Sequence, residues 1–131
     1  THMYMDLNAG INNFIIRDGT TTRYTFDDNG SFTATGNVTA YSDERIKDEI
    51  EVIPDALDKV SQIRGVTYVR KDLPTNKRYT GVIAQEVEKV LPEAVEMFDR
   101  DMKSVAYGNI VGLLIEAIKE LKAEVEELKN K

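Results

Sequence analysis

The feature that most constrains the fold of this chain is a heptad repeat near its C-terminus. Apolar residues recur there at alternating spacings of three and four: Val111, Leu114, Ile118, Leu121, Val125 and Leu128. A stripe with this spacing follows one side of a helix and packs against a second helix, as in a coiled coil. We therefore predict a helix over about 108–130 that associates with copies of itself. The alternative is an amphipathic helix that packs only on its own domain.

The N-terminal part of the chain has a different composition, rich in Thr, Asn and Gly. Alternating runs such as NFIIR, TRYTF and SFTAT are separated by the turn signals DG and DDNG, which is typical of short strands joined by tight turns. Large apolar residues are too few in 4–41 to close a core, so we expect this β segment to intertwine with other chains rather than to form the sheet of a monomer. We interpret residues 1–3, Thr-His-Met, as the remnant of an expression tag.

The residues between these two parts alternate between helical and extended patterns. The predicted elements are a short helix in 54–65, a strand at 66–70, a loop at 71–80, a strand running into a helix that stops at Pro92, and a hairpin around 99–101. With the last helix, this order predicts an α+β domain.

Composition excludes several classes of function. A net charge of -6 argues against a nucleic-acid partner, because such partners are held by clustered Lys and Arg. No apolar run is long enough to cross a membrane, and no signal-like segment opens the sequence, so we expect no membrane partner. His2 is the only histidine and cysteine is absent, which removes Ser-His triads, Cys nucleophiles and His or Cys metal sites. We therefore expect no metal and no cofactor.

The stretch YSDERIKDEI, 41–50, offers a different kind of chemistry. Ser42 precedes Lys47 by five residues, and a neutral lysine amine can accept the proton of a serine hydroxyl. Burial would favour the neutral amine, whereas the four acidic residues between 43 and 49 favour the ammonium ion. A separation of five places the two side chains on different faces of a regular helix or strand, so they meet only across a turn or between chains. The same Ser-Asp-Glu triplet is also typical of a helix N-terminus, with Asp43 as the cap.

Four segments, taken in order, resemble one known domain. SDERIKDEI, ALDKVSQIRGVTYV, GVIAQEVEKVLPEAV and VAYGNIVGLLIEAIKELKAEVEELK are similar to the C-terminal intramolecular chaperone domain, of the peptidase S74 type, found in phage tail spikes, tail fibres, neck appendages and endosialidases. The resemblance covers 42–131 and implies an intertwined homotrimer that aligns and folds the fibre chain before it, here the end of a β-rich stalk at 4–41. It also implies assembly in the host cytoplasm, after which the fibre part stays on the virion and the chaperone part is released.

The resemblance implies a self-cleaving serine peptidase of single turnover, with Ser42 and Lys47 as its catalytic dyad. The family cuts after the serine, here between Ser42 and Asp43. Attack by Ser42 on its own carbonyl would form a strained four-membered ring, so a neighbouring chain's hydroxyl or an activated water is the more reasonable nucleophile. Attack on the carbonyl of Tyr41 passes through a five-membered ring and would cut between Tyr41 and Ser42, which is the less favoured bond. The alternative function is a structural trimerisation or receptor-binding tip that never cuts.

Overall fold

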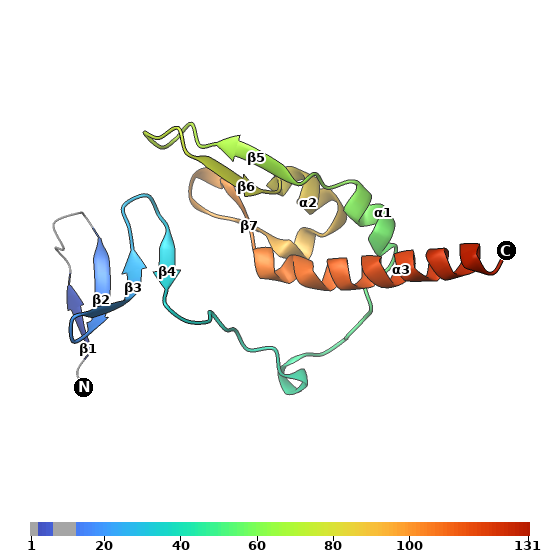
Figure 1. Ribbon diagram of the computed structural model, residues 1–131, viewed down its shortest axis with the longest axis horizontal. Coiled ribbons are helices and arrows are strands. Elements are labelled where there is room, and N and C mark those ends of the chain that lie inside the picture. Colours follow the sequence, from blue (N-terminus) through green and yellow to red (C-terminus); the bar gives the residue numbers. More distant parts are fainter. Residues whose placement is uncertain (1–2, 7–12) are drawn as a thin grey trace. The chain divides into compact units, whose positions relative to one another are not determined.

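A computed structural model of the chain describes residues 3–6 and 13–131 and has the α+β architecture that the sequence predicts (Figure 1). The chain divides into two compact units, Thr1–Asp48 and Glu49–Lys131, which we describe separately. Of the predicted tag remnant, residues 1 and 2 lie outside the described residues, whereas Met3 begins the first strand. Among the helices of the described part, none has the length and apolar content needed to span a membrane.

The first unit contains an antiparallel sheet of four strands in sequential order. These are β1 (Met3–Asp6), β2 (Phe14–Asp18), β3 (Thr21–Phe26) and β4 (Phe32–Ala34). Gly19 and Gly30 adopt positive φ angles of 62° and 85° in the predicted DG and DDNG turns, a conformation that glycine adopts without steric cost. The carboxylate of Asp27 holds the second turn by accepting hydrogen bonds from the amides of Asn29 and Ser31.

The apolar core of this sheet is small. Within the described part of the first unit, Ile15 is the one buried apolar residue. The rings of Phe26 and Phe32 contact each other at a tilt, with centroids 4.9 Å apart, yet 45% of Phe26 and 47% of Phe32 stay exposed. Little of the apolar surface of this sheet is buried within the single chain, and the expected association with partner chains stays a prediction.

Residues 35–52 are exposed throughout and contain one short element, the 3-10 helix η1 (Glu44–Ile46). The predicted domain boundary between residues 41 and 42 falls in this stretch and stays a prediction.

The second unit contains three α-helices and two hairpins. Its elements are α1 (Ala56–Ser61), β5 (Val66–Val69), β6 (Arg78–Gly81), α2 (Ala84–Val90), η2 (Pro92–Ala94), β7 (Val95–Met97), η3 (Asp99–Asp101), β8 (Lys103–Val105), η4 (Tyr107–Ile110) and α3 (Val111–Lys129). The order of elements matches the sequence prediction, but the predicted loop at 71–80 is too long. Its last residues belong to β6, because Tyr79 pairs with Tyr68 across the hairpin and their rings stack 6.0 Å apart.

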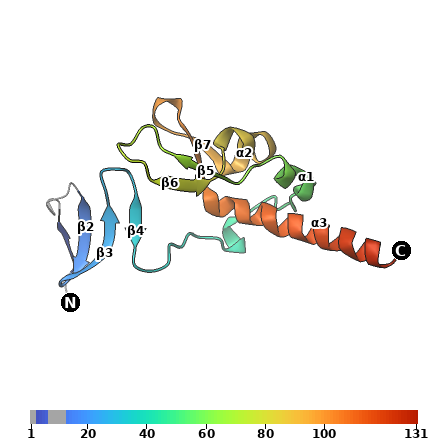
Figure 2. The ribbon, with the colours of Figure 1, turned by 45° about the horizontal axis from the view of Figure 1, so that its top comes forward.

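The core of the second unit is built where α1, α2 and η2 meet α3. Figure 2 shows α1 and α2 on the same side of α3. The buried residues of this cluster are Ala56, Val87, Leu91, Ala94, Leu113 and Ala117. Helix α1 has no side-chain cap of its own, because Asp55 at the N-cap adopts φ 51° and ψ 40°. Instead, the carboxylate of Glu120 on α3 accepts hydrogen bonds from the amides of Ala56 at 2.8 Å and Leu57 at 3.0 Å.

Helix α3 has two apolar faces. Leu113 and Ala117 pack into the core of the second unit and are 0% and 4% exposed. The six residues of the heptad repeat lie outside this core and are 42–67% exposed: Val111, Leu114, Ile118, Leu121, Val125 and Leu128. The helix therefore packs on its own unit with one face and leaves the heptad face uncovered in the single chain.

Candidate active site

The side chains of Ser42 and Lys47 contact each other within one chain. The amine Nζ of Lys47 donates a hydrogen bond of 2.6 Å to the hydroxyl Oγ of Ser42, and both residues are exposed. The spacing of the two residues allowed a contact either across a turn or between chains. In the structure they meet across a turn within one chain.

The η1 turn brings these two residues together. Asp43 and Lys47, which flank the turn, are extended, with φ and ψ of -66° and 137° and of -113° and 138°. Between them, the amide of Ile46 donates to the carbonyl of Asp43 and the amide of Lys47 donates to the carbonyl of Glu44. Three residues of 3-10 helix advance only about 6 Å, a gap that the long lysine side chain spans. Neither a continuous helix nor a continuous strand would give this approach.

An ion pair between Asp43 and Arg45 contributes to the turn. Oδ1 of Asp43 accepts a hydrogen bond of 2.8 Å from the amide of Arg45 and one of 3.0 Å from its Nε, while Oδ2 accepts one of 2.9 Å from Nη2. The guanidinium, with the amide of Arg45 as the second cause, lowers the pKa of the Asp43 carboxyl. Asp43 in turn raises the pKa of Arg45. The expectation that Asp43 caps a helical turn is confirmed; the ion pair with Arg45 was not predicted.

The surroundings of the pair are open. A shallow hollow of about 460 Å³ is lined by Tyr41, Asp43, Arg45 and Ile46. Tyr41 is 94% exposed and Ile46 is 62% exposed, so neither side chain is covered in the single chain. In the part of the chain that the structure describes, no three His, Cys, Asp or Glu side chains gather in a way that could hold a metal ion.

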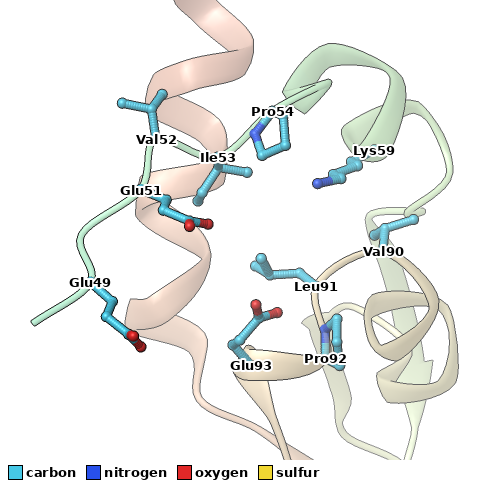
Figure 3. A pocket seen from close by; sticks show the side chains of 10 residues that line it. All are labelled: Glu49, Glu51, Val52, Ile53, Pro54, Lys59, Val90, Leu91, Pro92 and Glu93. Carbon is cyan, nitrogen blue, oxygen red and sulfur yellow. The ribbon is translucent and has the colours of Figure 1, made fainter.

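A second hollow lies in the second unit and was not singled out from the sequence. It measures about 420 Å³ and opens between the segment 49–54, α1 and the turn from α2 to η2 (Figure 3). Ile53, Val90 and Leu91 form apolar walls, and Glu51 and Glu93 bring carboxylates to it. Its lining comes from three separate parts of the sequence, so no local pattern marks it.

Comparison with known proteins shows which family part of this sequence matches. The model of the family described as chaperone of endosialidase, Peptidase_S74, matches residues 42–96, which begin at the candidate serine. The long tail fiber protein Gp37 of Enterobacteria phage M1 is 37% identical over 120 residues, covering 82% of this chain and 48% of the relative, and the protein of the same name from Enterobacteria phage Ox2 gives the same figures. The Gp37 protein of Enterobacteria phage K3 is 35% identical over 102 residues, covering 72% of this chain and 8% of the relative.

The chain spans about half the length of the first two of these relatives and a small fraction of the third. The family match includes the η1 turn with both Ser42 and Lys47, the helices α1 and α2, and the hairpin β5–β6 between them. The resemblance drawn from the sequence is therefore confirmed over residues 42–96, which match the peptidase S74 family, the chaperones of endosialidase.

Proposed function

We propose that this chain is the intramolecular chaperone of a phage tail fibre, that it works as a homotrimer, and that it releases itself by cutting next to Ser42. The family match and the similarity to tail fibre proteins support a chaperone role associated with a fibre. The single observation that carries the self-cleavage is the 2.6 Å contact between the Ser42 hydroxyl and the Lys47 amine.

In this proposal Lys47 is the general base and Ser42 supplies the hydroxyl. A neutral Lys47 amine takes the hydroxyl proton, and the oxygen attacks a carbonyl carbon to form a tetrahedral adduct. The C–N bond then breaks, the proton passes to the leaving amine, and water hydrolyses the resulting ester to restore the serine. For a cut between Ser42 and Asp43, the attacking group is the hydroxyl of a neighbouring copy or a water that Lys47 activates, because attack by Ser42 on its own carbonyl is strained.

In this proposal, assembly of several chains removes water from the Ser42–Lys47 pair. Removal of water from around an amine favours its neutral form, which is the form that a general base needs. The uncovered heptad face of α3 supports association with further copies, and the family resemblance suggests that there are three of them. Three aligned chains would also bring together three small sheets, each with little apolar core of its own.

The same proposal places assembly in the host cytoplasm, with the fibre part retained on the virion and the chaperone part released. The partners are the other copies of the chain and the fibre segment that precedes residue 42. A non-cleaving structural tip is the second candidate function, since the relatives are named as long tail fiber proteins.

Intact mass measurement of freshly purified protein tests the proposal. The parent chain should yield two fragments that join between Ser42 and Asp43, whereas Ser42→Ala and Lys47→Ala should stay whole and assemble to the same size by light scattering. Ser31→Ala, at an exposed serine in the turn before β4, is the matched control and should be cut as the parent is. Unchanged fragmentation of Ser42→Ala would remove the dyad assignment, and a parent that stays whole would favour the structural tip.

A further inference from the structure

We propose that Asp43 and Arg45 are positioning residues, whose carboxylate–guanidinium pair locks the η1 turn so that the Lys47 amine stays within reach of the Ser42 hydroxyl. This inference rests on the proposed self-cleavage and adds two residues to the site. Neither residue is assigned to the chemistry itself.

The contacts of Asp43 support the lock. Its two oxygens accept three hydrogen bonds from Arg45, one from the backbone amide and two from the guanidinium, at 2.8–3.0 Å. The backbone bond caps the start of the turn, and the two guanidinium bonds fix the direction of the carboxylate. A lysine at position 45 could supply the charge but not this two-point geometry.

The turn needs such a lock because packing does not hold it. No residue of η1 is buried, and a three-residue 3-10 helix has little stability by itself. Ser42 directly precedes the cap residue, and Lys47 directly follows the last residue of the turn. If the turn opens, the two ends separate and the 2.6 Å contact is lost.

The same ion pair keeps a nearby carboxylate away from the base. Both oxygens of Asp43 are engaged by Arg45, and the Lys47 amine donates to Ser42. Without the guanidinium, Asp43 would be available to pair with Lys47 and hold it as the ammonium ion. Arg45 therefore favours the contact between the Lys47 amine and the Ser42 hydroxyl in two ways: it fixes the turn, and it neutralises the carboxylate of Asp43.

Cleavage rates of three variants test the inference. We expect Arg45→Gln to slow self-cleavage at least 10-fold and Arg45→Lys to recover part of that loss. Glu44→Gln is the matched control, since it changes a charge inside the same turn and leaves the ion pair intact; its rate should stay within about twofold of the parent. An Arg45→Gln chain that cuts at the parent rate, or an equal loss in Glu44→Gln, would overturn the proposal.

A rescue experiment separates positioning from direct catalysis. Propylamine added to Lys47→Ala can replace the missing amine without depending on the turn. If Arg45 acts by placing Lys47, adding Arg45→Gln to Lys47→Ala should leave the rescued rate unchanged. A further loss of the same size would show that Arg45 acts on the reacting groups themselves, which contradicts a positioning role.

A readout that needs no cleavage keeps the two proposals distinguishable. In the uncut Ser42→Ala chain, the amides of Arg45 and Lys47 donate within the turn, so their hydrogen exchange reports its opening. Arg45→Gln should raise both exchange rates several-fold, and Glu44→Gln should not. Unchanged exchange would reject the lock even if the parent cuts itself, whereas faster exchange in a parent that never cuts would retain the lock and reject the proposed function.

Discussion

Leu113 and Leu114 are consecutive residues of α3 with opposite surroundings: Leu113 is 0% exposed in the core of the second unit, and Leu114 is 45% exposed on the heptad face. One residue along a helix turns the side chain by about 100°, so a single helix can serve two contacts at once. Stability of the unit and association of the chains therefore depend on different residues of the same helix.

Substitution of these two leucines should separate the two properties. Leu113→Ala leaves a cavity in the core and should lower the free energy of unfolding of the second unit by about 2–5 kcal/mol. Leu114→Ala should leave the unfolding of the dissociated chain almost unchanged and weaken association instead. Urea unfolding and light scattering over a dilution series measure the two effects. Equal losses of stability in the dissociated chains would show that Leu114 also belongs to the core.

Leu121→Asp tests whether assembly controls cleavage. Leu121 lies at the centre of the heptad repeat, where the copies would bury several carboxylates together without partners. We expect this variant to be monomeric by light scattering and to stay uncut, because the Ser42–Lys47 pair remains exposed to water in a single chain. Ala123→Asp adds the same charge away from the repeat and should assemble and cut normally. Cleavage of a monomeric variant at the parent rate would show that one chain completes the site.

The rate of self-cleavage should rise with pH. A lysine accepts a proton only as the neutral amine, and the neutral fraction grows as the solution becomes more basic. We expect the first-order rate to climb between about pH 6 and 10, measured by gel or mass spectrometry after denaturant removal, with assembly monitored in parallel. A flat profile over this range with constant assembly would argue against a lysine base.

Acid should weaken the second unit through Glu120. The amides of Leu57 and Ala56, in that order, lower the pKa of the Glu120 carboxyl in the folded chain. A carboxylate with a depressed folded pKa contributes stability above its unfolded value, roughly 4.3, and loses that contribution as the pH falls through the folded value. Glu120→Gln should therefore melt at a lower temperature than the parent at pH 7, and the difference should shrink below about pH 4.

Glu127→Gln is the control for Glu120, since it lies two turns further along the same side of α3 and is exposed. Its melting temperature should follow that of the parent at each pH, as measured by circular dichroism. A constant difference between Glu120→Gln and the parent from pH 7 to pH 3 would show that the charge of Glu120 is not what caps α1.

Tyr107 packs over Gly81 and leaves little room for a side chain there. A Cβ at position 81 would lie 2.4 Å from Oη of Tyr107 and 3.3 Å from its Cζ. We expect Gly81→Ala to cost about 1–3 kcal/mol of stability. The cost should be smaller in a Tyr107→Phe background, where the hydroxyl is gone, and a double-mutant cycle by urea unfolding measures the coupling. Equal costs in both backgrounds would locate the strain elsewhere.

Local patterns in the sequence predicted much of this fold. The heptad spacing located α3, and Pro92 correctly ended α2, because both signals arise within one element. The start of β6 was placed too late because Arg78–Gly81 becomes a strand only by pairing with β5. The cap that Glu120 provides to α1 joins residues more than 60 positions apart, and no local pattern encodes it.

The candidate site was also only partly predictable from local patterns in the sequence. The family resemblance indicated Ser42 and Lys47 as candidate residues, while helical and strand periodicity indicated only that they could not meet in a regular element. The meeting depends on a single 3-10 turn and on the bond between Asp43 and Arg45. Side-chain hydrogen bonds of this kind depend on exact rotamers, which residue spacing does not reveal.

The position of the η1 turn limits how long the proposed activity can last. Ser42 lies before the Ser42–Asp43 bond and Lys47 lies after it, although their side chains are 2.6 Å apart. A cut at that bond leaves the serine at the end of the fibre part and the lysine near the start of the chaperone part. Once the two parts separate, neither retains both groups, so the released chaperone cannot attack other proteins. The reaction dismantles its own site, and no inhibitor is needed to stop it.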